Sequence, residues 1–151
     1  MATFYRIVQA EWARVAMNGE GAFLHGGRWN PPGLHAVYLA ESRALAALEI
    51  IVHAPRQVLS LDWRIIEVEV PDDLIQSASI ADLPAGWQSL PSSLAARNFG
   101  EAWLRARKVL ALKLPSVIIP EEHSLMLNPR HADVVKLRVS KPKKFELDSR
   151  F

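Results

Sequence analysis

The apolar positions of the chain follow two periods, and they predict several short strands and two principal helices. Residues 64–70 alternate strictly, with Ile66, Val68 and Val70 on one face and two glutamates on the other. This alternation is typical of a half-buried strand, which Pro71 ends. Short apolar runs predict further strands at residues 4–8, 36–40, 117–119, 125–127 and 134–139.

The first predicted helix covers residues 44–54. Ser42 offers an N-cap for it, and Pro55 stops it. Residues 19–33 hold five of the seven glycines and two prolines, so they predict a loop with sharp turns and no helix.

The second predicted helix begins after Ser92 or Ser93 and continues through Leu112, although Gly100 weakens its middle. Residues 71–91 are predicted to be irregular. Together the elements predict an α+β fold, a single compact domain of short mixed strands with flanking helices over residues 1–151.

Composition excludes several classes of protein. The length of 151 residues suits one domain, and a chain that is 50% hydrophobic and 23% charged is an ordinary globular protein. The absence of cysteine excludes disulfides, thiolate zinc sites and a cysteine nucleophile. The sequence shows neither a signal-peptide pattern nor a long uncharged apolar run, so the expected location is the cytoplasm, without membrane association.

The net charge of +2 conceals an asymmetry. Residues 1–100 carry seven Lys or Arg against ten Asp or Glu, whereas residues 101–151 carry eleven against six. So small a net charge disfavours bulk nucleic-acid binding. The basic end is either simply solvated or a local patch for an acidic partner, and it holds Lys136, Arg138, Lys141, Lys143 and Lys144.

The most informative segment for chemistry is HGGRWNPPG, residues 25–33. Gly26 and Gly27 let backbone N–H groups converge, and Arg28 places a cation beside them, which together suit a phosphate or diphosphate. The spacing matches neither a dinucleotide-binding fingerprint nor a phosphate-binding P-loop. A tight turn with a surface arginine is the alternative.

Glu49 is an acid inside an apolar helix segment, LAALEIIVH, and His53 lies one turn further on. Its carboxylate is paired in the core, directed into a cleft, or exposed with a local histidine contact. Other chemistry is poorly supported. Five scattered histidines do not form a zinc motif, and the chain lacks the GxSxG motif of serine hydrolases. A third segment, residues 114–131, holds three prolines around Ser116, Ser124 and Asn128.

Taken together, these segments resemble the RES-domain family, which is named for an Arg, a Glu and a Ser. The pieces are FYRI, GGRWNPPG, VYLAES, ALEIIVH, LPSVIIP and LNPRH, in the order of the family and over nearly the whole chain. The resemblance implies a single RES domain over residues 1–151, with a fold similar to ADP-ribosyltransferases. It also implies a bacterial toxin of a toxin–antitoxin pair, neutralised by an Xre-like helix-turn-helix antitoxin.

The implied activity is cleavage of the nicotinamide–ribose bond of NAD+, which arrests growth. NAD+ is then a substrate and no prosthetic group or metal is expected. We expect NAD+ degradation by hydrolysis or phosphorolysis. The alternatives are protein ADP-ribosylation, which shares this bond cleavage, and a non-catalytic module that only binds the antitoxin. DNA contact is expected only through the antitoxin, and a homo-oligomer or a larger toxin–antitoxin assembly stays open.

The resemblance also assigns residues. Arg28, Tyr38, Glu49 and His53 stand at the family positions, and the family serine is Ser116 or, as second candidate, Ser124. Arg28 with the backbone of Gly27 would hold the phosphates, Tyr38 would stack on nicotinamide, and Glu49 would stabilise the cationic ribose. His53 would orient Glu49 or the nucleophile. The expected substrate-binding set is Gly27, Arg28, Trp29, Asn30, Tyr38, Ser124 and Asn128, and the expected catalytic set is Arg28, Tyr38, Glu49, His53 and Ser116.

Overall fold

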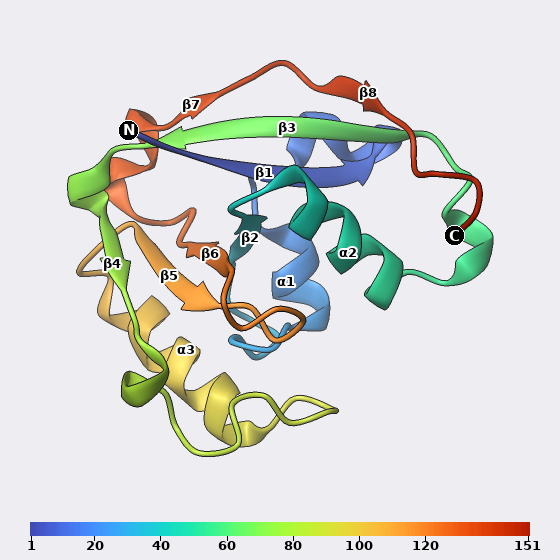
Figure 1. Ribbon diagram of the computed structural model, residues 1–151. Coiled ribbons are helices and arrows are strands. Elements are labelled where there is room, and N and C mark those ends of the chain that lie inside the picture. The colour runs from blue at the N-terminus through green and yellow to red at the C-terminus, as the bar shows by residue number, and fades with distance from the viewer.

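The computed structural model describes residues 1–151 and confirms the α+β fold class. One curled sheet runs in the order β4-β5-β6-β2-β1-β3-β7 (Figure 1). β8 also pairs with β3, at the start of that strand, whereas β7 pairs near its end. Only β4 and β5 pair in parallel. The strands are β1 (Ala2–Gln9), β2 (Val37–Ala40), β3 (Trp63–Val70), β4 (Ile75–Ser77), β5 (Ala111–Pro115), β6 (His123–Leu127), β7 (Arg138–Val139) and β8 (Lys143–Phe145).

The sheet consists of two halves that meet at a narrow joint. β1 pairs with β3 through eight residue pairs, from Ala2↔Val70 to Gln9↔Trp63. It pairs with β2 only at Tyr5↔Ala40. On the other side of this joint, β2, β6 and β5 form continuous ladders. β1 and β2 therefore diverge on either side of this one pair. Their backbone N–H and C=O groups there do not bond to each other and need other partners.

Three α-helices accompany the sheet, α1 (Glu20–His25), α2 (Arg43–His53) and α3 (Leu94–Ala106). Helix α2 begins where predicted, because the Ser42 hydroxyl accepts a hydrogen bond from the N–H of Leu45 at 3.0 Å. Its buried face packs Leu45 and Ala46 against Ile7 of β1 and Ile65 of β3. This packing fixes α2 across one face of the sheet, in front of β1 and β2 (Figure 1).

An aromatic cluster joins α3 to the glycine-rich loop. Trp29 is buried and stacks on Trp87 at a centroid distance of 6.2 Å, and the edge of Phe99 of α3 meets it at 5.9 Å. Gly100 faces the backbone of Trp29 so closely that a Cβ atom there would overlap the Trp29 carbonyl group. Trp29 therefore belongs to the core, where it anchors the loop.

The prediction that residues 19–33 contain no helix was wrong, since α1 forms inside this segment. Gly19 and Gly26, with φ of 74° and 73°, take left-handed conformations at its two ends. The Asn18 side chain also accepts from the N–H of Glu20 at 2.9 Å. The glycines therefore bound a short helix between them rather than prevent it.

The second helix was predicted too long. It is capped by Ser93, as expected, but it ends at Ala106 because Arg107 turns left-handed at φ 50°. Leu112 lies instead in β5, between β4 and β6. The short strand β4 within residues 71–91 was not predicted.

Two strand predictions also failed. Residues 117–119 form the turn from β5 to β6, because the Ser116 hydroxyl accepts from the N–H groups of Ile118 and Ile119. Of residues 134–139, the first three belong to a 3-10 helix over Ala132–Lys136, and only Arg138–Val139 pairs with β3.

Candidate active site

Arg28 lies in the loop before β2, where its half-buried side chain bridges two segments. Nη1 donates to the carbonyl oxygens of Trp87 at 3.0 Å and Ser89 at 2.8 Å. Burial lowers the pKa of Arg28, and the nearby Glu49 carboxylate opposes that shift. Its Nε and Nη2 donate no hydrogen bond within the protein, so they are free to bind an anion.

Glu49 and His53 form a pair on α2. His53 Nε2 lies 3.2 Å from Glu49 Oε2, and the Glu49 side chain is 34% exposed while that of His53 is 71% exposed. The hydrogen bond to Glu49 raises the pKa of His53, whereas burial and the charge of Arg28 lower it. The Glu49 carboxylate therefore acts electrostatically on both Arg28 and His53, two of the residues that the sequence assigned to one site.

Tyr38 is held by the glycine-rich loop. Its hydroxyl donates to Asn30 Oδ1 at 2.7 Å, and burial raises its pKa above the ordinary tyrosine value. Asn30 is fully buried, and its Nδ2 donates to the carbonyls of Ala22, Pro31 and Leu34. A Cβ atom on Gly27 would come within 3.1 Å of the Tyr38 hydroxyl. Gly27 and Asn30 thus position the tyrosine ring.

The expected use of backbone N–H groups as a phosphate cradle is not what the loop shows. The N–H of Gly26 donates to Ala22 at 2.8 Å, and that of Gly27 donates to Asn30 at 3.0 Å. Both donors are occupied within the protein, so the Arg28 side chain is the anion-binding group that the segment offers.

The two candidate serines differ in their surroundings. Ser116 is 1% exposed, and its hydroxyl accepts the two hydrogen bonds of the turn described above. Ser124 lies in β6 opposite Ala40, and Met126 opposite Tyr38, so Ser124 shares the sheet face of Tyr38. Its hydroxyl is half-buried and forms no hydrogen bond within the protein. The structure therefore leaves Ser124, not Ser116, with a free hydroxyl.

Two residues expected to bind substrate have structural contacts instead. Trp29 lies in the aromatic cluster described above. The buried Asn128 amide donates to the carbonyl of Leu104 at 3.0 Å and accepts from the N–H of Arg130 at 3.0 Å. Asn128 ties the end of α3 to β6, and it lines a separate cavity rather than the surroundings of Tyr38.

Sequence reasoning missed Arg6, which lies in β1 at the joint between the two sheet halves. Its Nη1 donates to the carbonyl of Tyr38 at 2.9 Å, taking the place of a strand N–H where the ladder has ended. Its Nε is buried and has no hydrogen-bond partner. Burial lowers the pKa of Arg6 to about 10, so the side chain stays positively charged at neutral pH. A buried cation without a carboxylate is a signal of anion binding, but the sequence FYRIV does not reveal burial.

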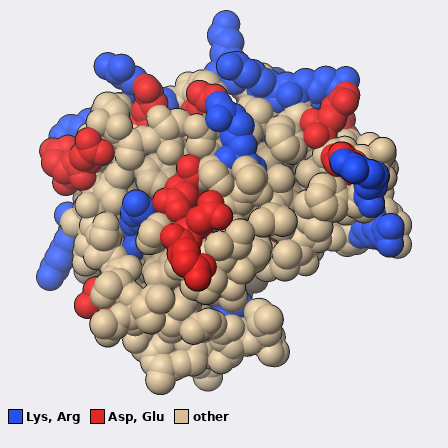
Figure 2. Space-filling view, in the orientation of Figure 1, with Lys and Arg blue, Asp and Glu red and all other residues tan.

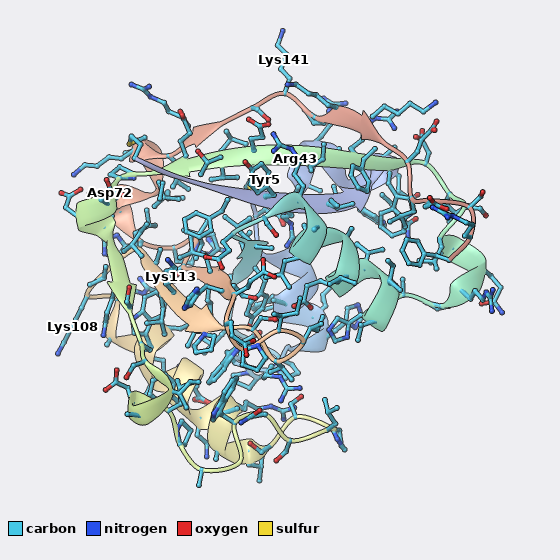
Figure 3. The ribbon with its side chains drawn as sticks, in the orientation of Figure 1. Tyr5, Arg43, Asp72, Lys108, Lys113 and Lys141 are labelled. Carbon is cyan, nitrogen blue, oxygen red and sulfur yellow. The ribbon has the colours of Figure 1, made fainter.

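The start of α2 is clamped to the sheet by Arg43. Its guanidinium lies 4.4 Å from the centre of the Tyr5 ring and donates to Glu67 at 2.6 Å (Figure 3). Tyr5 forms the joint between the sheet halves and Glu67 belongs to β3, so this clamp fixes the helix that carries Glu49.

The rest of the structure adds two observations. No three His, Asp or Glu side chains gather in a way that could hold a metal ion. No helix has the length and apolar character needed to cross a membrane.

Comparison with known proteins identifies the family. A family model described as the RES domain matches residues 3–148, and the chain belongs to this family. The chain is similar to a protein of Sphingobium sp. named Prs ADP-ribosylating toxin, with 41% identity over 137 residues, 89% of this chain and 85% of the relative. It is 34% identical over 147 residues, 97% of this chain and 94% of the relative, to a protein of Photorhabdus laumondii named Toxin Res. A shorter match of 49 residues, 32% of this chain and 25% of the relative, is 49% identical to NAD(+) phosphorylase MbcT of Mycobacterium tuberculosis.

Proposed function

We propose that the protein is a toxin that cleaves the bond between nicotinamide and ribose in NAD+. The observation that carries the proposal is the group formed by Arg28, Glu49 and His53, in which Glu49 pairs with His53 at 3.2 Å and its charge also acts on Arg28. It carries both signs of charge, as NAD+ does with its cationic nicotinamide ring and its anionic diphosphate. The names of the relatives agree, since one is an ADP-ribosylating toxin and another an NAD(+) phosphorylase.

Cleavage of this bond does not require an acid catalyst, because the nicotinamide ring of NAD+ is already cationic and leaves as a neutral molecule with the bonding electrons. The ribose then carries positive charge in an oxocarbenium-like transition state. Glu49 would accept from a ribose hydroxyl and stabilise this charge. His53, bonded to Glu49, would orient the carboxylate, and the acceptor would add to the ribose carbon and lose its proton.

Two arginines would hold the diphosphate. Arg28 offers Nε and Nη2, and Arg6 offers a buried cation with an unpartnered Nε at the joint of the sheet. Charge-assisted bonds from guanidinium to phosphate are the stronger kind of hydrogen bond. Tyr38 would present its ring to nicotinamide, and Ser124, on the same sheet face, would bond to the substrate.

The test follows free nicotinamide after purified protein is mixed with NAD+. Release of nicotinamide supports the proposal. No release in water, with phosphate and with a lysate as protein acceptor would overturn it. A heat-denatured sample controls for spontaneous hydrolysis.

The acceptor is a separate question. A relative that this chain matches over 85% of its length is named as an ADP-ribosylating toxin, whereas the phosphorylase matches over about a third of the chain. We therefore place transfer of ADP-ribose to a protein first and phosphorolysis second. NAD+ radiolabelled in its ADP-ribose part distinguishes them, because label on a protein band marks transfer and label in a phosphorylated ADP-ribose marks phosphorolysis.

An antitoxin partner belongs to the same proposal, and we place an Xre-like protein in that role. Lys and Arg side chains gather along the upper edge of Figure 2, over β7 and β8, and Lys141 stands at the top of Figure 3. Lys136, Arg138 and Lys144 pair with nearby acids. Lys141 and Lys143 have no such pair, so they are the residues available to an acidic partner. Co-expression with a neighbouring Xre-type gene should relieve growth arrest.

A further inference from the structure

A second cationic feature lies outside the candidate active site. A cavity of about 650 Å³ opens between the end of α3, the segment before β2 and the segment after β6. We name it the basic cavity. Its lining consists of Gly33, Leu34, His35, Leu104, Arg105, Arg107, Asn128 and Arg130.

The arginines of the basic cavity are poorly neutralised. Arg105 pairs with Glu101 at 2.9 Å, and His35 lies 3.2 Å from Glu20. Arg107 and Arg130 have no carboxylate within 4 Å, and no acid contributes to the lining. Positive charge from two separate chain segments, the end of α3 and the segment after β6, therefore converges on one hollow, where it favours an anion.

The position of Arg130 is fixed from two sides. Asn128 Oδ1 accepts from its backbone N–H at 3.0 Å, while the Asn128 amide holds the carbonyl of Leu104 at the end of α3. The guanidinium reaches His35, with Nη2 3.2 Å from Nε2, and the His35 ring stacks on Phe23 at 4.3 Å. A surface arginine that was merely solvated would need none of these supports.

Arg107 occupies a backbone conformation that glycine adopts more easily. It is the only residue other than glycine with positive φ, at 50°, and it directly follows α3, where glycine is the common residue. Placing arginine there costs conformational energy, of order 1 kcal/mol. Such a conflict between local preference and residue type is expected where the side chain has a function.

We propose that the basic cavity binds a phosphate-bearing small molecule of nucleotide size. Its volume lies in the range of ligand sites, its cations suit phosphate oxygens, and Leu34 and Leu104 supply an apolar surface for a base or sugar. The inference does not require NAD+ cleavage, since binding is measured without turnover.

The experiment measures binding of pyrophosphate, AMP and an oligo-glutamate peptide by calorimetry at low salt. It uses the wild type and the Arg28→Gln variant, which weakens binding at the candidate active site. In the Arg28→Gln background, Arg107→Gly and Arg130→Gln should each weaken binding about tenfold, the loss of one charge-assisted hydrogen bond. Exposed Arg14→Gln is the matched control and should leave affinity unchanged. Tighter binding of AMP than of pyrophosphate indicates that the leucines contact the base or sugar.

Arg107→Gly separates binding from folding. Glycine relieves the left-handed backbone, so this variant should melt no lower than the wild type while it loses affinity. Equal affinity in both cavity variants and in Arg14→Gln would overturn the proposal. So would binding that Arg28→Gln alone abolishes, which places the anion at the candidate active site, or tighter binding of the acidic peptide than of AMP.

Discussion

The Arg28–Glu49 site and the basic cavity both use residues of the segment 26–35, yet their charges are arranged differently. Around Arg28, a carboxylate and two loop carbonyls balance the guanidinium. Around Arg107 and Arg130, the lining offers no acid. The first arrangement suits a ligand that carries both positive and negative charge, whereas the second suits a ligand with negative charge only. The kind of ligand that an arginine binds therefore depends on the charged and polar groups around it.

We expect the largest effect from Glu49→Gln, which removes the carboxylate of the Arg28–Glu49 site and leaves the basic cavity unchanged. NAD+ cleavage should fall about a hundredfold to a thousandfold, as when one electrostatic contact to a transition state is lost. The nicotinamide assay measures this rate, and circular dichroism checks folding. Glu101→Gln removes an equivalent one-turn pair, with Arg105, and should keep activity. An active Glu49→Gln protein contradicts the assigned role.

Gly100→Ala should disturb both sites together, because α3 and the loop meet there. The new Cβ would overlap the Trp29 carbonyl, so the free energy of unfolding should fall by about 3 kcal/mol. Urea denaturation measures it. Gly21→Ala is the matched control, since a Cβ at Gly21 meets no atom within 4 Å and alanine favours the helix. Equal stability of the two variants would show that α3 does not pack on the loop this closely.

Arg6→Met tests whether the buried cation serves the ligand or the fold. The KM for NAD+ should rise about tenfold, the equivalent of one phosphate contact. Stability should change little, because removing a buried charge without a carboxylate offsets the lost hydrogen bond to the Tyr38 carbonyl. Steady-state kinetics and thermal melting measure the two effects. Arg6→Lys should recover part of the KM. A clear loss of stability with unchanged KM assigns Arg6 to the fold.

The two serines should separate cleanly. Ser124→Ala should lower kcat/KM about fivefold, since one neutral hydrogen bond is lost. Ser116→Ala should leave activity intact and cost about 1 kcal/mol of stability, because its hydroxyl caps the turn before β6. Kinetics and denaturation of the pair give the answer, and the reverse outcome would restore Ser116 as the family serine.

The smallest effect concerns pH. The hydrogen bond to Glu49 raises the folded-state pKa of His53 above its ordinary value of 6.5. The stability it contributes is therefore fully present below that value and is lost as the pH rises through the folded-state pKa. His53→Gln should lower the Tm more near about pH 5.5 than near about pH 8.5. Because the side chain is 71% exposed, the difference should stay under about 0.5 kcal/mol. A difference in Tm between the variant and the wild type that does not change with pH would contradict the His53–Glu49 interaction.

The sequence predicted features that depend on local chemistry. The Ser42 cap with its helix and the alternating strand before Pro71 both follow from neighbouring residues, and the structure confirms them. Helix α1 was missed because two left-handed glycines bound it, which composition does not show. The end of α3 was missed because pairing with β6 drew Leu112 into the sheet.

The site shows the same division. Arg28, Glu49 and His53 were chosen from sequence, and the structure brings their charges together. Arg6 was missed because an arginine in a strand ordinarily points to water, whereas here the side chain is buried beside the single β1–β2 pair and donates to the Tyr38 carbonyl. Asn128 was placed with the substrate because its motif was matched, whereas its amide holds the chain together.

The order of strands has a consequence for how the protein is made. β6 (His123–Leu127) lies between β2 and β5, so the sheet half that carries Tyr38 cannot close until residue 127 has left the ribosome. Contacts between segments so far apart in the chain form slowly. A chain still in synthesis lacks the strand with Ser124 and cannot yet support Tyr38. The candidate site therefore becomes complete only after residue 127 has been synthesised, and shorter nascent chains do not present it.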